Sequence, residues 1–319
     1  MPATEFSSGT SQLELSTSQI RTFCTVFELG SYSAAARRIG LSTSAVWEQV
    51  KEIERQYATR LFVRQGRQVV ATSSGQRLDD LLRPLLAGLD STRQIMHQQS
   101  ESWTGRVTIA TGVRMLIEEV GTALRAFQRR HPDVSVCIHQ SDSRDAEPLV
   151  ANGDVDMALT LEPGPGYAGK AVTLEPAYDI DYLLIAPPRH PLGQKRRVHP
   201  ADLAKYPLVV PHQDTYSRHL VDQMLHQHGL TDSARIVVET ANSAFTAACV
   251  RAGLGVGMIA GQANGPLCKG LVVHSLACWL GQARIVFVRR RGAHLSPILR
   301  QLSDTIRSVT TSSRDKSNR

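Results

Sequence analysis

The chain has 319 residues, of which 42% are hydrophobic, and it carries a formal net charge of +7. A chain of this length is expected to form two or three domains with real cores. Its five cysteines are scattered and form no CxxC pair, which argues against a disulfide framework and for reduced thiols in the cytoplasm. No stretch approaches the roughly 18 apolar residues of a membrane-spanning helix, so we expect no membrane partner.

The first hundred residues are predicted to be mainly helical, after a disordered lead-in at residues 1–16 that shows no signal peptide. Apolar residues recur at helical spacing over residues 17–29, and Gly30 follows where a helix end favours glycine. Ser31 or Ser33 is placed to cap a second, short helix that stops at another glycine.

A third helix is predicted after Ser42 or Ser44, either of which can cap it. One side of this helix is an apolar stripe formed by Val46, Val50, Ile53 and Tyr57. The opposite face carries Ser44, Trp47, Glu48, Lys51 and Arg55. In the segment that follows, apolar residues alternate around Gly66, which predicts a two-stranded hairpin.

Two helices, a turn, a third helix and a hairpin form the winged helix-turn-helix pattern, which we assign to residues 17–74. In that geometry the third helix enters the major groove of DNA with its N-terminal residues foremost. Residues 31–72 hold seven basic and three acidic side chains, so this segment carries +4 of the total charge. A concentrated basic face attracts polyanions, although the same charges also fit a solvated helical face.

A long helix is predicted from residue 75 to about residue 98. Its apolar positions are spaced by 4, 3, 4, 3 and 4 residues, at Leu78, Leu82, Leu85, Leu89, Thr92 and Met96. This heptad spacing favours pairing of two chains, and packing of the helix on its own domain is the alternative. Pro84 is expected to kink or loosen the helix near its start. We assign residues 75–104 to this dimerising linker helix and a hinge.

From residue 105 onward, predicted strands alternate with helices, which implies parallel sheets covered by helices. Two such lobes fit into residues 105–310, with chain crossings near 161–175 and 265–275, and residues 311–319 are expected to be a solvated tail. A cleft between two α/β lobes, at the carboxyl ends of strands, is a natural ligand site. The predicted fold class is therefore α/β with an all-α, winged N-terminal part.

The chain resembles the LysR-type transcriptional regulators from about Thr17 to Arg307. Its segment FELGSYSAAARRIGLSTSAVWEQVKEIERQYATRLFVRQGRQVVATSSG is similar to the family's winged-helix signature. The segments FQRRHPDVSV, LVANGDVDMAL, HPL, DLAKYPLVV and VRAGLGVGMIAG then follow in the family's order. The resemblance implies a homodimer or homotetramer that binds double-stranded DNA and acts on the transcription machinery in the cytoplasm, at the nucleoid. It also implies a periplasmic-binding-protein-like effector domain, without enzymatic activity, cofactor or metal.

The recognition helix departs from the family pattern. Where the family commonly has Ser-Gln-Pro-Ala-Leu-Ser-Arg, this chain has Ser-Thr-Ser-Ala-Val-Trp-Glu at residues 42–48. Thr43 and Ser44 stand where Gln and Pro usually face bases, and Trp47 and Glu48 stand where Ser and Arg usually meet DNA. Thr can contact a thymine methyl, and Glu can accept a hydrogen bond from cytosine N4. Otherwise Glu48 must pair with a neighbouring cation or weaken binding, and Trp47 must pack into a protein contact.

Arginines on either side of the Gly66 turn are placed to reach phosphates or the minor groove. The full set of candidate DNA-contacting residues is Ser31, Ser33, Arg37, Thr43, Ser44, Trp47, Glu48, Lys51, Arg64 and Arg67.

Candidate effector-binding residues follow the predicted strand ends in the C-terminal half. They are Thr111, Gly112, Val113, Arg114, Ser141, Ser143, Thr160, Thr215, Ser217, Thr240 and Asn242. Hydroxyl groups at helix N-termini favour a carboxylate or another small anion, and Arg114 is expected to add positive charge. The same residues also fit ordinary helix caps.

The remaining groupings carry little chemistry. The histidines at positions 212, 219, 226 and 228 are not spaced to share a metal ion, and no convergent nucleophile or acid–base set stands out. The competing interpretation is a solute-binding or enzymatic α/β module that carries a basic dimerising arm.

Overall fold

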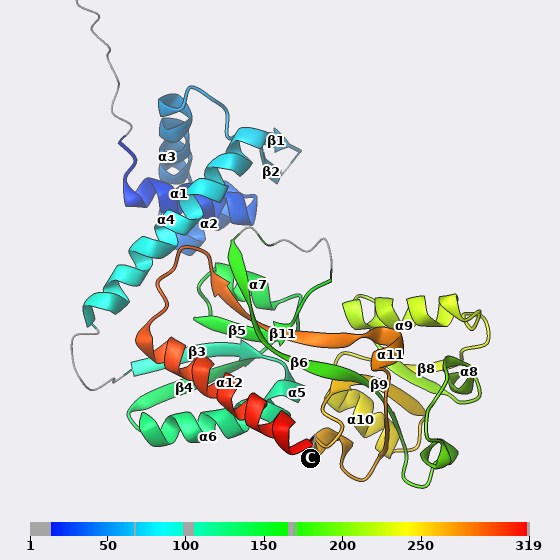
Figure 1. Ribbon diagram of the computed structural model, residues 1–319. Helices are drawn as coiled ribbons and strands as arrows, with labels where there is room; N and C mark the ends of the chain where they lie inside the picture. Colours follow the sequence, from blue (N-terminus) through cyan, green and yellow to red (C-terminus); the bar gives the residue numbers. More distant parts are fainter. Residues whose placement is uncertain (1–13, 67, 98–104, 165–168, 170, 318–319) are drawn as a thin grey trace, which may run out of the picture. The chain divides into compact units, whose positions relative to one another are not determined.

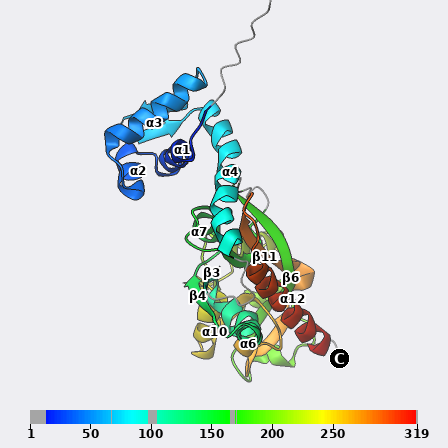
Figure 2. The ribbon, with the colours of Figure 1, turned by 90° about the vertical axis from the view of Figure 1, so that its left-hand side faces the viewer.

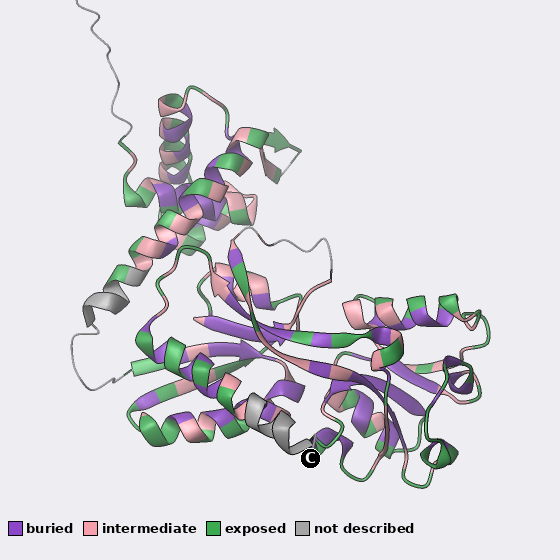
Figure 3. Cartoon of the chain, in the orientation of Figure 1, coloured by how far each residue is buried: buried purple, intermediate pink, exposed green. Residues whose placement is uncertain are grey.

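The computed structural model describes residues 14–66, 68–97, 105–164, 169 and 171–317. The chain divides into two compact units. The first ends at Arg93 and also includes the short segment Gly292–His294, and the second contains the rest of the chain. Each unit has hydrophobic clusters of its own, and Figure 3 shows their buried residues on the inner sides of the helices and along the strands.

Three helices open the first unit (Figure 1): α1 (Thr17–Leu29), α2 (Tyr32–Ile39) and α3 (Thr43–Gln56). Their starts and ends follow the predicted signals. Ser31 caps α2 and Ser42 caps α3, so in each pair of candidates the first serine is the cap. Gly30 ends α1 with a φ of 57°, a left-handed conformation that suits glycine. The predicted apolar stripe of α3 is confirmed, because Val46, Val50 and Ile53 are fully buried.

The predicted hairpin is also present. Strands β1 (Phe62–Gln65) and β2 (Gln68–Ala71) pair antiparallel, and Gly66 lies in the turn with a φ of 60°. Glu54, near the end of α3, holds this hairpin in place. Its carboxylate accepts hydrogen bonds from the backbone N–H groups of Leu61 at 2.8 Å and Phe62 at 3.2 Å.

Helix α4 (Ser73–His97) begins two residues before its predicted start and continues through Pro84. The predicted seam is wrong in its first half. Leu78 and Leu82 are buried in the core of the first unit, where they pack against the winged domain. The exposed leucines are instead Leu81, Leu85 and Leu89, which are spaced by four residues and lie on one side of the helix. Thr92 is exposed, and the side chain of Met96 lies outside the described residues.

The second unit is built on one sheet of nine described strands in the order β4-β3-β5-β11-β6-β9-β7-β8, with β10 (Val272–Ser275) paired to β6. One end of the sheet is the parallel set β3 (Gly105–Thr111), β4 (Val134–Gln140) and β5 (Met157–Leu161). The other end is the parallel set β7 (Leu208–Pro211), β8 (Ile236–Thr240) and β9 (Val256–Gly261). The two predicted lobes correspond to these two sets.

Two long strands join the lobes: β6 (Val172–Ala186) and β11 (Gln282–Arg290) pair antiparallel to each other in the middle of the sheet. The first predicted crossing, near 161–175, lies at the start of β6. The second, near 265–275, is wrong, because that segment contains the short turn η3 (Pro266–Cys268) and the strand β10. The chain returns through β11, whose apolar sequence gave no sign that it would pair with both β5 and β6.

Helices cover the faces of this sheet (Figure 1). The longer ones are α6 (Gly121–Arg130), α7 (Ala146–Ala151), α9 (Tyr216–Gln227), α10 (Ser243–Arg251) and α12 (Pro297–Ser317). The shorter ones are α5 (Val113–Met115), the π-helical turn η1 (Leu116–Val120), η2 (Pro191–Gln194), α8 (Pro200–Leu203) and α11 (Ala277–Leu280). After β11 the chain returns to the first lobe, because α12 packs beside α6 (Figure 2).

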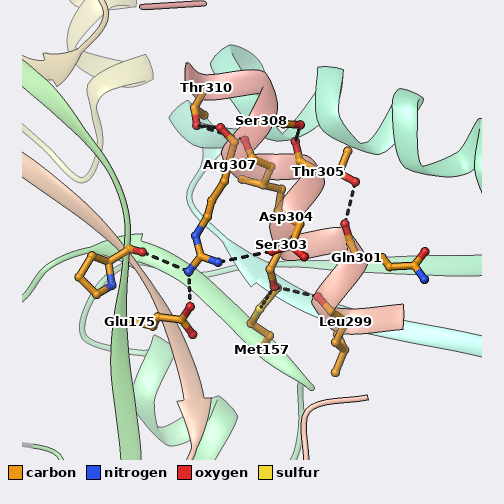
Figure 4. Close-up of polar contacts among 12 residues, drawn as sticks. Met157, Glu175, Leu299, Gln301, Ser303, Asp304, Thr305, Arg307, Ser308 and Thr310 are labelled. Atoms are coloured by element: carbon orange, nitrogen blue, oxygen red, sulfur yellow. Dashed lines mark hydrogen bonds and ion pairs between the residues drawn. The ribbon is translucent and has the colours of Figure 1, made fainter. Parts of the chain in front are cut away.

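Polar contacts fix α12 on the sheet (Figure 4). Arg307 forms an ion pair with Glu175 of β6, and the Ser303 hydroxyl donates to Met157 Sδ of β5 at 3.3 Å. Arg289 of β11 reaches the same glutamate at 2.5 Å. These contacts explain why a C-terminal helix belongs to the first lobe although it is distant in sequence.

Candidate functional site

The exposed face of α3 carries the predicted recognition residues. Thr43, Ser44, Trp47, Glu48 and Lys51 are all exposed, and the Trp47 side chain keeps 49% of its surface accessible. An exposed tryptophan of this size normally marks a binding surface rather than a core position. The predicted polar face of α3, formed by Ser44, Trp47, Glu48, Lys51 and Arg55, is exposed at all five positions.

Charges beside Glu48 are already engaged with other acids. Lys51 Nζ lies 2.6 Å from Glu54 and 5.6 Å from the centroid of the Trp47 ring, and Arg55 forms an ion pair with Glu52 at 2.6 Å. Neither cation makes the ion pair with Glu48 that the sequence left open. The acid at position 48 consequently stands on the presented face of the helix, next to an indole ring.

The other candidate DNA-contacting residues belong to α2 with its N-cap and to the hairpin. Ser31 caps α2 and its hydroxyl lies 3.1 Å from that of Ser33, while Arg37 is exposed in the last turn of α2. Arg64 is exposed on β1 and donates a hydrogen bond to the Gly66 carbonyl at 3.1 Å. Arg67 lies outside the described residues.

A cavity of about 220 Å³ lies in the second unit, where strands of the two lobes end. Most candidate effector-binding residues line it: Gly112, Val113, Arg114, Ser141, Ser143, Thr160, Thr215, Ser217, Thr240 and Asn242. Thr111 does not. It is 2% exposed at the end of β3, and its hydroxyl is buried without a hydrogen-bond partner. The expectation that ligands bind at the carboxyl ends of strands therefore locates the cavity but wrongly places Thr111 in its wall.

Several of these polar groups are used within the protein. The Thr215 hydroxyl caps α9 by accepting from the Arg218 N–H at 3.2 Å, and the Asn242 side chain caps α10. The Thr240 hydroxyl lies 2.6 Å from that of Thr246. Ser141 differs, because its hydroxyl is buried in the cavity wall without a hydrogen-bond partner. A buried polar atom left unpaired is costly, so a ligand at this position gains by pairing with it.

Arg114 does not provide the positive charge that the sequence predicted. Its Nη1 donates to Glu118 at 2.9 Å and to Glu119 at 2.8 Å, so two carboxylates surround one guanidinium. Arg218 is likewise paired, with Asp222 at 2.7 Å and Glu239 at 3.0 Å. The sequence gives no signal for this neutralisation, because it depends on a π-helical turn directly after α5.

Sequence reasoning also missed part of the cavity wall. Tyr182 comes from the middle of β6 and Tyr216 from the start of α9, while Asp142 and Asp145 follow β4. The two aspartates were detectable, since they adjoin Ser141 in the same loop. Tyr182 was not, because the face of a long crossing strand that meets a cavity is decided by the pairing of distant strands.

Neither a metal site nor a membrane span is found in the described part of the chain. No three histidine, cysteine, aspartate or glutamate side chains there gather as metal ligands would, and no described helix combines the length and apolarity needed to cross a bilayer. The five cysteines, all within the described ranges, are unpaired.

Comparison with known protein families matches both units. Residues 17–76 match the model of bacterial regulatory helix-turn-helix proteins of the lysR family, and residues 100–311 match the LysR substrate binding domain. The chain belongs to the LysR family of transcriptional regulators. This regulator therefore binds DNA through its N-terminal domain and has an effector-binding domain, and members of its family are not enzymes but typically oligomeric DNA-binding proteins.

Individual relatives agree with this assignment. The regulator is 30% identical over 299 residues to the uncharacterized HTH-type transcriptional regulator YfeR of Shigella flexneri, covering 92% of this chain and 94% of that protein. It is 26% identical to the HTH-type transcriptional regulator CysB of Haemophilus influenzae, over 75% of this chain and 73% of that one. These names leave the alternative of a solute-binding or enzymatic module without support.

A full-length OxyR variant from Pseudomonas aeruginosa has a similar structure. Its TM-score is 0.62 at 16% identity, and the match covers 93% of this regulator and 96% of that chain. At this identity the likeness concerns the fold alone.

Proposed function

We propose that this regulator recognises its operator with the exposed face of α3 and grips the DNA backbone with the hairpin. Thr43, Ser44, Trp47 and Glu48 contact bases in the major groove, whereas Arg64 and Arg67 contact phosphates or the minor groove. The support is the exposure of the α3 face, which presents an indole and a carboxylate whose neighbouring cations pair elsewhere.

The remaining contacts come from α2 and its N-cap and from the flank of α3. Ser31, Ser33 and Arg37 approach the backbone from α2, and Lys51 approaches it beside Trp47. A shift of DNA from the gene's own upstream region in a gel, abolished by salt, tests the DNA-binding mode. Binding that resists salt would argue against a phosphate-dominated contact.

We further propose that the cavity between the lobes holds a small effector with a carboxylate or another small anionic group. The observation that carries this proposal is the unpaired, buried Ser141 hydroxyl in the cavity wall, near the N-termini of α9 and α10. Because Arg114 is paired with two glutamates, the anion's contacts come from the helix dipoles at the N-termini of α9 and α10 and from the hydroxyl groups of the wall. Asp142 and Asp145, which also line the cavity, disfavour a ligand of high negative charge.

A thermal-shift screen of small carboxylates, amino acids and aromatic acids tests this proposal. A ligand at 100 times its Kd adds about 2.7 kcal/mol to the free energy of unfolding. Ser141→Ala should weaken that stabilisation. Thr111→Ser is the matched control, since Thr111 does not line the cavity and its hydroxyl is retained. Equal stabilisation of both variants would place the ligand elsewhere.

For assembly, we propose a homodimer or homotetramer in which α4 contributes to an interface between chains. The support is the row of exposed leucines at positions 81, 85 and 89. Such a regulator acts on the transcription machinery in the cytoplasm, at the nucleoid.

A further inference from the structure

Arg114, Glu118 and Glu119 are buried together where the two lobes meet. Their side chains expose 7%, 0% and 1% of their surface. The glutamates belong to the π-helical turn that follows β3 and α5, in the first lobe. Gln262 follows β9 of the second lobe, and its Nε2 donates to Glu119 Oε1 at 3.1 Å. A backbone hydrogen bond from Gln262 also reaches Glu118. The cluster therefore ties the lobes to each other.

The charges of this cluster do not balance. Two carboxylates and one guanidinium leave a net charge of −1 if all three groups are ionised. The side chains that also face the cluster are Tyr178 of β6, which lies against Arg114 and Glu119, and Cys268 of η3, which lies near Glu118. Neither supplies positive charge. An uncompensated buried charge is strongly unfavourable, and a protein normally removes it by protonation.

Hydrogen bonding in the cluster is incomplete in the same way. Glu118 Oε1 is buried without a hydrogen-bond partner, whereas the Tyr178 hydroxyl is hydrogen-bonded to the side chains of Arg114 and Glu119. Glu118 Oε1 is tightly enclosed, since a Cβ at position 265, where the chain has glycine, would lie 2.4 Å away. A proton on Glu118 cancels the excess charge and converts an orphaned acceptor into a donor.

The two glutamates are not equivalent. Both accept hydrogen bonds from Arg114 and Gln262, but only Glu119 is also hydrogen-bonded to the Tyr178 hydroxyl, whereas Glu118 Oε1 has no partner. Burial raises the pKa of Glu118, and the Arg114 charge opposes this less than burial and the neighbouring Glu119 favour it. The proton therefore belongs on Glu118.

We propose that this cluster is a single-proton latch between the lobes, in which Glu118 carries the proton and Arg114 bridges the two glutamates. Arg114 also lines the cavity, so the latch adjoins the effector site. Ionisation of Glu118 at higher pH restores the unbalanced charge and weakens the contact between η1 and the segment after β9.

Two variants of the full-length protein separate the role of Glu118 from that of Glu119. Glu118→Gln replaces a neutral carboxyl with a neutral amide of the same shape and does not have to take up a proton on folding, so its unfolding equilibrium constant at neutral pH should lie at or below the wild-type value. Glu119→Gln removes the carboxyl oxygens that Arg114 and Gln262 contact and leaves the Glu118 carboxyl in place, so its constant should rise by about tenfold. Urea unfolding measures both. Equal losses in the two variants, or failure of Glu118→Gln alone to fold, would overturn the proposal.

The pH dependence gives a second measurement. Because the pKa of Glu118 is raised in the folded state, its proton stabilises the wild type most at low pH, and that stabilisation is lost as pH rises from the unfolded value of about 4.3 through the folded value. Within that window the ratio of the Glu118→Gln constant to the wild-type constant should fall by up to about tenfold per pH unit. A ratio independent of pH would contradict a raised pKa.

Infrared spectroscopy tests the proton directly. In the pH window between the unfolded and the folded pKa of Glu118, the wild type should show the carbonyl band of a buried protonated carboxyl, and Glu118→Gln should lack it. A wild type without this band would show Glu118 to be ionised. None of these measurements requires an effector. A screen that finds no ligand would thus count against the proposed cavity function and leave the latch to be judged separately.

Discussion

Glu54 shows how one buried side chain connects the recognition helix to the hairpin. It is 8% exposed, accepts from two backbone N–H groups at the start of β1, and lies 2.6 Å from Lys51 Nζ. Burial alone would raise its pKa, but these hydrogen bonds to the charged form lower it below 4.5. In the sequence Glu54 is one acid among a basic stretch, and nothing there distinguishes it from its exposed neighbours.

We expect Glu54→Ala to destabilise the winged domain by about 1–3 kcal/mol, because two buried N–H groups lose their acceptor. Glu52→Ala, which breaks the exposed pair with Arg55 and the hydrogen bond from the Gln56 side chain, should change little. Since the pKa of Glu54 is lowered on folding, its contribution is present above pH 4.5 and is lost as pH falls through the folded value. Urea unfolding across acidic pH measures both effects. Equal destabilisation by the two substitutions would refute the special role of Glu54.

Side chains on the face of α3 should divide into those that set sequence preference and those that set affinity. Trp47→Ala and Glu48→Ala should change preference at single base positions by about 1–3 kcal/mol. Arg64→Ala should weaken binding to all sequences alike and reduce the salt slope by about one unit. Glu48→Ala should also bind non-specific DNA more tightly, because an acid repels phosphate.

A randomised site library at two salt concentrations measures these differences. Arg55→Ala is the matched control, since Arg55 is exposed on the same helix but paired with Glu52. If the sequence preference of both Trp47→Ala and Glu48→Ala were unchanged, specificity would have to come from Thr43, Ser44 or DNA shape.

Among the elements, α4 marks the limit of sequence periodicity. Spacing predicts the long helix that the structure shows over Ser73–His97, because period alone defines a helix. It cannot decide which apolar stripe meets the chain's own core, since the stripe of Leu78 and Leu82 and the adjoining stripe of Leu81, Leu85 and Leu89 both satisfy helical spacing. The choice depends on where the winged domain packs, which is a tertiary property.

A substitution in the exposed stripe of α4 should affect assembly, and one in the buried stripe should affect stability. Leu85→Asp should leave the stability of the winged domain nearly unchanged and shift the oligomer toward smaller species, because Leu85 is 60% exposed. Leu82→Ala should destabilise that domain by about 2–5 kcal/mol, because it leaves a cavity in the core. Sedimentation and urea unfolding give the two readouts. An oligomer that survives Leu85→Asp together with Leu81→Asp would exclude this face of α4 as an interface.

In the effector domain, too, the sequence predicts the local elements but not how distant segments pair. Alternating strands and helices predict both parallel sets and the cavity at their carboxyl ends, because local pattern and the connection rule are enough to place them. The pairing of β6 with β11 is not predictable in this way. Both strands are apolar, and their antiparallel register joins residues about a hundred positions apart. Tyr182 reaches the cavity wall only through that pairing.

For the whole molecule, the hydrophobic clusters argue for two units that fold on their own. The cluster of the first unit draws only on residues up to Leu86, and the three clusters of the second draw only on residues from Val107 onward. A fragment of residues 105–319 should therefore fold, keep the unfolding midpoint of the effector domain, and show the same ligand-induced thermal shift as the full chain, because its cavity wall is complete. It should not bind DNA.

Calorimetry and the same carboxylate screen test this prediction, with Ser141→Ala in the fragment as the control. An unfolded fragment would mean that the second unit needs the first for its stability, and a folded fragment without the ligand shift seen in the full chain would mean that the effector site requires residues before 105.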